Sequence, residues 1–170
     1  MIFSEKHKDK FYLVTGGSRG IGAKIAELLA AEGARVAITY SSNEAKAENV
    51  LAGLKGDSHR MVRMNLREPE SITEAFKSVL DDFGQLDGLV NNAGISEGGP
   101  IELLSDEKFR YQMEVNLFAV RNVTNTFLPL LKGNKSQGVP GGKIIMISSV
   151  SGTFNTPCSG AYCISKHALE

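Results

Sequence analysis

The sequence has little of what would tie a chain to a membrane or a nucleic acid. Its 19 basic and 19 acidic side chains cancel over 170 residues, so no overall field attracts a polyanion. No apolar run is long enough to span a bilayer, and residues 1–10 mix charges where a secretory signal needs an apolar core. These absences favour a cytoplasmic protein with no nucleic-acid partner and no membrane segment.

Cysteine and histidine are also scarce. The two cysteines, Cys158 and Cys163, lack C-x-x-C spacing and lie close together in an expected loop and helix, so we expect free thiols. His7, His59 and His167 are far apart and show no metal-ligand spacing. The sequence therefore predicts no metal site.

Strand and helix patterns alternate through the chain. A composition of 42% hydrophobic and 22% charged residues is typical of one globular domain, here residues 1–170. We expect strands at residues 11–14, 35–40, 60–64, 86–90 and 143–147, the last being an apolar run typical of a central strand covered on both faces. The alternation predicts an α/β fold, a Rossmann-type doubly wound parallel sheet with helices on both sides.

Apolar spacing predicts the helices. In the first, Ile21, Ile25, Leu28 and Leu29 follow the spacing of one buried face, and Gly33 is placed as a stop. Other helices are expected at residues 44–54, after cap chemistry supplied by residues 41–43, at 72–83, from about 105, over 117–131 and over 159–170. Residues 132–142 are expected to form a solvent-exposed connection.

The stretch Thr-Gly-Gly-Ser-Arg-Gly-Ile-Gly at residues 15–22 lies between the first strand and the first helix. Glycines allow a tight turn and a close approach of the main chain to a pyrophosphate, and the helix N-terminus favours an anion. A purely structural turn is the alternative for a motif this short. Because ligands bind at the carboxyl ends of such strands, the turns after Val14, Tyr40, Val90 and Ile147 are expected to line one site.

Tyr162 and Lys166 are spaced i, i+4, so their side chains emerge from the same face of a helix. A nearby ammonium favours the phenolate, which makes a tyrosine a usable acid and base. Taken alone, the pair is more often an ordinary pair on an amphipathic helix than a catalytic one.

The motifs together resemble the short-chain dehydrogenase/reductase family. They are Thr15-Gly16-x-x-x-Gly20-x-Gly22, Asn91-Asn92-Ala93-Gly94, Asn116, Ser149 and Tyr162-x-x-x-Lys166, in the family's order. Members of the family commonly continue beyond the equivalent of Glu170. We therefore expect the C-terminal part of the usual fold to be absent, leaving a sheet edge exposed beside residues 143–147 and a chain that is no competent catalyst alone.

The resemblance implies hydride transfer between a nicotinamide cofactor and a carbonyl or alcohol substrate. Tyr162 would protonate the carbonyl oxygen, Ser149 would polarise it, and Lys166 would favour the phenolate and bind the nicotinamide ribose. Asn116 would hold a water for proton relay through its main chain, and Asn91 would lie near the adenine-side ribose. The implied cofactor contacts are Gly16, Ser18, Arg19, Gly20, Ile21, Gly22, Tyr40, Ser41, Ser42, Asn65, Leu66, Asn92, Ala93, Gly94, Tyr162 and Lys166.

The end of the second strand favours NADP(H) over NAD(H). NAD selectivity there usually comes from a carboxylate that binds the ribose 2′-hydroxyl, and residues 39–42 contain none. Arg19 can meet a 2′-phosphate as a charged fork. Near the adenine, Asn65 stands where the family usually has an aspartate, which leaves an amide able to donate and accept.

Three functions are compatible with these motifs. The first is a ketone or 3-oxoacyl-type reductase or a secondary alcohol dehydrogenase, expected as a homo-oligomer in its full-length form. The others are a non-catalytic nucleotide-binding regulatory protein and an inactive fragment. The three residues between Gly16 and Gly20 argue against a sugar-nucleotide epimerase, which usually spaces these glycines differently.

Overall fold

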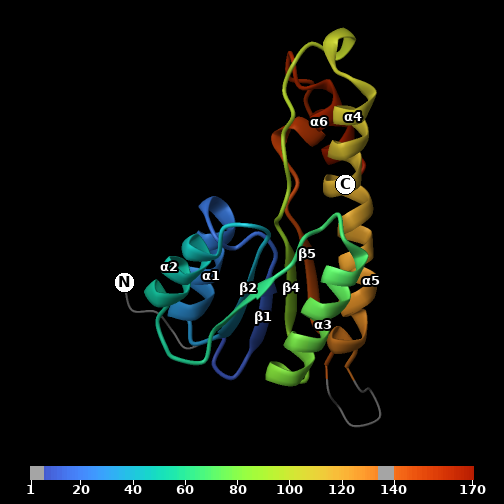
Figure 1. Cartoon of the computed structure of the whole chain (residues 1–170). Helices are drawn as coiled ribbons and strands as arrows, with labels where there is room; N and C mark the ends of the chain where they lie inside the picture. Colours follow the sequence, from blue (N-terminus) through green and yellow to red (C-terminus); the bar gives the residue numbers. More distant parts are fainter. Residues whose placement is uncertain (1–5, 134–139) are drawn as a thin grey trace.

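Five parallel strands form the centre of the computed structural model, which describes residues 6–133 and 140–170 (Figure 1). Their order is β3-β2-β1-β4-β5. From β1 the chain adds β2 and β3 on one side and then returns to add β4 and β5 on the other side. The strand order therefore reverses between β1 and β4. This confirms the Rossmann-type arrangement. The strands are β1 (Phe11–Val14), β2 (Arg35–Tyr40), β3 (Arg60–Arg63), β4 (Gly88–Asn91) and β5 (Lys143–Met146).

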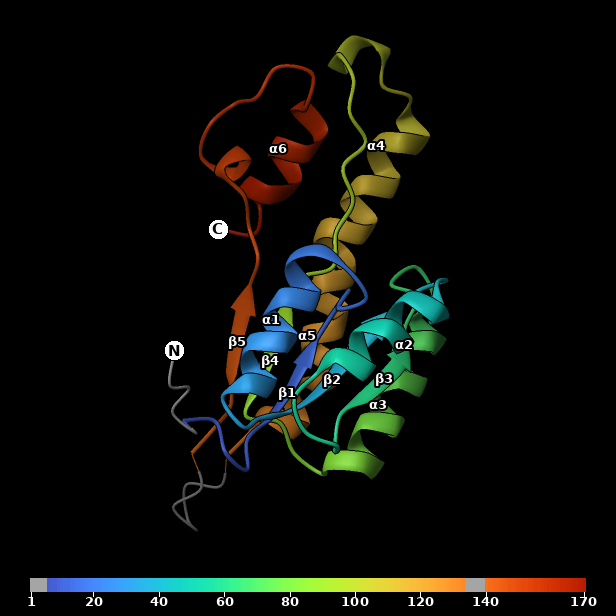
Figure 2. The same cartoon turned by 90° about the vertical axis from the view of Figure 1, so that its left-hand side faces the viewer.

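Helices cover both faces of this sheet. One face carries α1 (Gly20–Ala31) and α2 (Glu44–Gly53), and the other carries α3 (Pro69–Phe83) and α5 (Ala119–Leu131) (Figure 1). Figure 2 shows α4 (Asp106–Met113) and α6 (Gly160–His167) beyond the carboxyl ends of the strands. Alternate strand residues divide the core accordingly: Leu13 packs in the cluster with α3 and α5, and Val14 in the cluster with α1 and α2.

The buried face of α1 differs from the expected one. Ile25 and Leu29 pack partly against the core, but Ile21 is 65% exposed and Leu28 48% exposed. The row that meets the sheet consists of small residues, Gly22, Ala26 and Ala30. Small side chains at i, i+4 and i+8 let the helix lie close to the strands, so the larger side chains are pushed to the flanks. The helix ends at Ala31, and Gly33 follows it with φ +92° as the expected stop.

The strand β5 is an edge strand of the described sheet. It pairs with β4 on one side, and its side chains Ile144, Ile145 and Met146 are 38–45% exposed. The expectation of a central strand covered on both faces is therefore wrong for these residues. The expectation of an exposed sheet edge here is confirmed.

A π-helical segment that the sequence pattern did not predict joins α4 to α5. It is η2 (Glu114–Phe118), and it makes one continuous rod of what was expected as two separate helices (Figure 1). A π turn inserts an extra residue and rotates the following helix, and such segments are frequent at functional sites. Here the segment buries Val115 and Asn116.

The helix caps and the free thiols agree with the sequence. Asn43 caps α2 by accepting a hydrogen bond from Lys46 N, and Pro69 lies in the first turn of α3. Both cysteines are free thiols. Within residues 6–133 and 140–170, no cluster could hold a metal ion and no helix is long and apolar enough to cross a membrane. Part of the expected connection 132–142, residues 134–139, lies outside the described residues.

Phe127 provides a test of the core between α5 and the sheet. It is fully buried and meets the ring of Phe76 edge-on at 5.6 Å between centroids. Phe127→Ala should lower the free energy of unfolding by about 3–5 kcal/mol, because truncating a buried aromatic leaves a cavity. Urea denaturation of the two proteins measures the difference.

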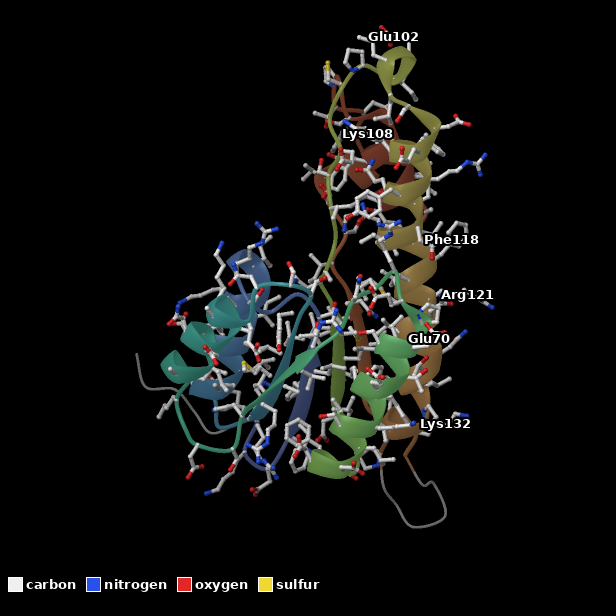
Figure 3. All side chains as sticks on the ribbon, in the orientation of Figure 1. Glu70, Glu102, Lys108, Phe118, Arg121 and Lys132 are labelled. Atoms are coloured by element: carbon white, nitrogen blue, oxygen red, sulfur yellow. The ribbon has the colours of Figure 1, made fainter. Side chains whose placement is uncertain are left out.

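Phe118→Ala is the matched control, since Phe118 lies in the same rod, is 52% exposed and points away from the sheet (Figure 3). It should cost less than about 1 kcal/mol. Equal losses from the two variants would contradict the assignment of the core.

Candidate functional site

A cleft of about 700 Å³ opens at the carboxyl ends of the strands. It lies at the point where the strand order reverses between β1 and β4, as expected for this sheet. The turns after β1, β2, β3 and β4 contribute to it, but the turn after β5 does not line it. Its lining residues are Gly16, Ser18, Arg19, Gly20, Ile21, Thr39, Tyr40, Ser41, Ser42, Asn43, Lys46, Met64, Asn65, Leu66, Arg67, Asn92, Ala93, Gly94, Ile95, Tyr111 and Val115.

The glycine turn between β1 and α1 forms one wall of the cleft. Gly16 and Gly20 have φ of +64° and +57°, which glycine adopts without the strain of a side chain. A Cβ on Gly17 would lie 2.6 Å from the side chain of Ile38, so the turn also packs tightly on β2. At Arg19 the helix α1 begins with no side-chain cap and no acidic residue in its first turn. Its free N–H groups and positive dipole end therefore suit an anion.

Thr15 and Asn92 join this turn to the segment after β4. The Thr15 hydroxyl accepts hydrogen bonds from the main-chain N–H of Asn92 and of Ala93, both at 3.0 Å. The Asn92 amide donates to Thr15 O at 2.9 Å, and it fills the space that a Cβ on Gly22 would occupy. Gly22 does not line the cleft, so it serves the packing of α1 against this joint.

Asn91 has a different environment from the one the resemblance implied. Its side chain is buried and donates to Thr124 Oγ1 at 3.0 Å and to Met146 Sδ at 3.3 Å. These contacts tie β4 to α5 and β5, and Asn91 does not line the cleft. The structure thus places the Asn91 side chain between β4, α5 and β5, outside the cleft lining.

The charged side chains that line the cleft are all positive. Arg19, Lys46 and Arg67 line it, and no Asp or Glu is among its lining residues in the described part of the chain. Lys46 and Arg67 are additional to the residues expected from the sequence. The signals were present: Lys46 is three residues after the Asn43 cap, in the first turn of α2, and Arg67 directly follows Asn65 and Leu66.

Two carboxylates near the cleft accept hydrogen bonds from residues that line it. Tyr40 donates from its hydroxyl to Glu44 Oε1 at 3.0 Å, and burial, followed by this bond, raises the pKa of Tyr40. Asn65 donates from Nδ2 to Glu68 Oε1 at 2.6 Å and accepts from Arg67 N at 3.2 Å. The Asn65 amide therefore shapes the turn after β3.

The side chain of Lys166 reaches from α6 toward the end of β5. Its Nζ donates to Ile147 O at 2.7 Å and lies 5.8 Å from the ring centroid of Tyr162, so the expected pairing of the two side chains is observed. Lys166 is 5% exposed, and burial lowers the pKa of its ammonium group. One of its three N–H donors is used at Ile147, which leaves two for other acceptors.

Asn116 joins α6 to the segment that follows β4. Its Oδ1 accepts from Ile95 N and its Nδ2 donates to Ile95 O, both at 2.8 Å. The same Nδ2 lies 3.0 Å from Ser165 Oγ, next to Lys166. A Cβ on Gly94 would lie 3.1 Å from Asn116 Oδ1 and 3.7 Å from Lys166 Nζ, so all three residues meet at one point.

The four residues expected to be catalytic lie outside the cleft lining. The structure brings Asn116, Tyr162 and Lys166 together as described above. Ser149 caps the short helix η4 (Val150–Gly152) by accepting from Ser151 N at 3.1 Å, and η4 packs against α6. Within the described residues Ser149 makes no hydrogen bond to Tyr162.

Comparison with known proteins identifies the same fold and family. A family model described as short chain dehydrogenase matches residues 10–170. A solved short chain dehydrogenase from Burkholderia cenocepacia, in complex with NADP, superimposes with a TM-score of 0.85 at 36% identity over 95% of this chain and 64% of its own.

Two curated relatives are reductases. The 3-ketodihydrosphingosine reductase of Bacteroides thetaiotaomicron is 33% identical over 93% of this chain and 54% of its own length. The 3-oxoacyl-[acyl-carrier-protein] reductase FabG of Vibrio cholerae is 36% identical over 92% of this chain and 62% of its own. This chain thus spans between half and two thirds of the length of the relatives it matches. Because that family model matches nearly all of its residues, the chain belongs to the short-chain dehydrogenase family.

Proposed function

We propose that the protein is an oxidoreductase that transfers a hydride between NADP(H) and a carbonyl or secondary alcohol substrate. The observation that carries the proposal is the convergence of Asn116 and Lys166 at Gly94, a residue that lines the cleft, with the side chain of Tyr162 near Lys166. A nucleotide in the cleft would then end beside an acid/base pair. That arrangement suits redox chemistry at a carbon that also gains or loses a proton at oxygen.

The residues of the cleft fit a dinucleotide. The glycine turn and the uncapped N-terminus of α1 would hold the pyrophosphate. Residues Thr39–Asn43 and Asn65–Arg67 would enclose the adenosine, because both turns line the same cleft. Asn92, Ala93 and Gly94 would line the path toward the nicotinamide. When bound, the nicotinamide supplies or accepts the hydride.

Tyr162 would transfer the proton. In the direction of reduction its hydroxyl gives a proton to the substrate oxygen as the carbonyl carbon gains the hydride, and the carbonyl becomes an alcohol. The ammonium group of Lys166 would stabilise the phenolate that remains, and its two spare N–H donors could bind the nicotinamide ribose. The reverse sequence oxidises an alcohol.

Ser149 would orient the substrate oxygen. Its Oγ already accepts a hydrogen bond from Ser151 N, so its own proton stays available to donate. A donor aimed at the oxygen where charge develops stabilises the transition state more than the ground state. The two reductases described above act on 3-keto and 3-oxo compounds by their names, and this supports a ketone or 3-oxoacyl substrate here.

Tyr162→Phe in the full-length protein should reduce turnover by roughly 100- to 10,000-fold, because it deletes one proton-transferring oxygen and little volume. The dissociation constant for NADPH should stay within about 2-fold. Stopped-flow turnover on a ketone panel and titration of NADPH fluorescence measure the two quantities. Tyr12→Phe, which removes a hydroxyl bonded to His7 at the opposite end of β1, is the control. A Tyr162→Phe protein as active as this control would remove the tyrosine from the mechanism.

Arg19→Ala and Lys46→Ala should each weaken NADP(H) binding by roughly 10-fold and leave NAD(H) binding nearly unchanged, since only NADP(H) offers a 2′-phosphate to these cations. Calorimetric titration of each variant with both cofactors tests this. Lys24→Ala removes a lysine from α1 that is paired with Glu27 and does not line the cleft, and it should change neither affinity. Tighter NAD(H) than NADP(H) binding by the wild type would reject the preference.

Lys166 and Lys10 should titrate in opposite directions from the ordinary lysine pKa of 10.5. Burial lowers the pKa of Lys166, whereas the hydrogen bond to Asp87 raises the pKa of Lys10. Carbon-13 NMR of the lysine Cε signals gives both values in one experiment, with Lys166→Met and Lys10→Met as assignments. Asp87→Asn should return Lys10 toward 10.5 and leave Lys166 in place. A Lys166 pKa at or above that of Lys10 would contradict the buried environment described for α6.

A further inference from the structure

Gln112, on α4, binds the same segment that Asn116 binds from η2. Gln112 lies one helical turn before Asn116, is fully buried, and accepts a hydrogen bond through Oε1 from Glu97 N. Asn116 holds Ile95 in the same segment through both of its amide groups. We call residues 95–99 the strap; two buried amides on one side of the rod therefore fix two alternate residues of it.

The far end of the strap is tied to the turn that precedes α6. Gly99 N donates to Cys158 O at 2.8 Å, and Cys158 holds the left-handed φ of +58°. Ile101, just beyond the strap, packs against Gly160 at the first residue of α6. The strap thus bridges α4 and the beginning of the helix that carries Tyr162.

The Gln112 side chain is held at a cost in stability. Because Oε1 takes the N–H of Glu97, Nε2 is the opposite atom of the amide, and it has no hydrogen-bond partner among the described residues. A buried donor without a partner is unfavourable, and an apolar side chain of the same size would avoid it. Packing alone therefore does not account for an amide at this position, whereas the bond to Glu97 does.

We propose that Gln112 is a positioning residue that sets the placement of Tyr162 through the strap and the turn at Cys158. This inference rests on the proposed function, in which Tyr162 must meet the substrate oxygen. Releasing Glu97 would loosen the strap between its two anchors at Asn116 and Cys158. A catalytic group misplaced by about an ångström loses on the order of 100-fold in rate, so partial loosening should cost about 10-fold.

The test compares Gln112→Leu, which has no acceptor, with Gln112→Glu, which keeps an oxygen for Glu97 N–H. We expect kcat on a reactive ketone from the panel to fall about 10-fold in Gln112→Leu. In Gln112→Glu it should recover to within about 3-fold of the wild-type value. The melting temperatures of the two variants should rank in the opposite order to their kcat values. The leucine variant should melt close to the wild type, because it removes the unpartnered Nε2 donor but also leaves the part-buried Glu97 N–H without its acceptor. The glutamate variant should melt below the wild type because it buries a carboxyl group.

Hydrogen exchange measures how firmly the strap is held, independently of catalysis. The Gly99 amide should exchange about 10-fold faster in Gln112→Leu than in the wild type, because its bond to Cys158 loses the support of the strap. Gln85→Leu, the same substitution at an exposed residue of the loop before β4, should change neither exchange nor kcat.

The outcomes separate this inference from the proposed function. Wild-type protein that reduces no ketone while Gly99 exchange still rises in Gln112→Leu would reject the proposed function and leave the strap contact in place. Unchanged kcat and Gly99 exchange in Gln112→Leu would overturn the positioning role. A leucine variant that melts lower or fails to fold, with activity lost in proportion, would also overturn it, because the amide would then be structural.

Discussion

The hydroxyl of Thr15 is the contact on which the arrangement of the site depends. It accepts from two consecutive main-chain N–H groups after β4, while the Asn92 amide returns a bond to Thr15 O. Each such bond contributes about 0.5–1.5 kcal/mol net, but together they lock two turns from neighbouring strands at the reversal point of the sheet. The close contact between Gly16 and Ala93 follows, and so does the position of α1, since Gly22 lies against Asn92.

The rod formed by α4, η2 and α5 gives the site its second half. Tyr111 and Val115 line the cleft, and Gln112 and Asn116 grip the strap, so two neighbouring i, i+4 rows of one helix serve two different tasks. Arg67, from the turn after β3, lies over the ring of Tyr111 at 4.9 Å and joins that turn to this rod. The π turn matters because it rotates α5 onto the sheet while α4 stays free to reach α6.

Much of this was predictable from spacing, and what was not has a physical reason. Strand and turn positions follow from local composition, and the pairing of Tyr162 with Lys166 follows from helical periodicity. The buried row of α1 did not, because a close approach to the sheet selects small residues over the larger apolar ones that a periodicity count favours. Asn91 and Asn92 are adjacent in the chain but point to opposite faces of the strand, so one is buried under the sheet and the other holds the turn. Lys46 and Arg67 could not be predicted without the fold, since it brings the start of α2 and the turn after β3 to the same cleft.

The single sign of the cleft charge depends on how nearby carboxylates are held. Glu68 is bound by the Asn65 amide and lies 3.9 Å from Arg63, and Glu44 accepts from the Tyr40 hydroxyl. An aspartate at position 65 could still accept from Arg67 N, but it would place a second carboxylate against Glu68 at hydrogen-bond distance, where like charges repel. An amide removes that repulsion and also keeps a negative charge out of the cleft lining. The amide at Asn65 therefore adds to the absence of acidic residues among the described lining residues, and the charged side chains that line the cleft are all positive.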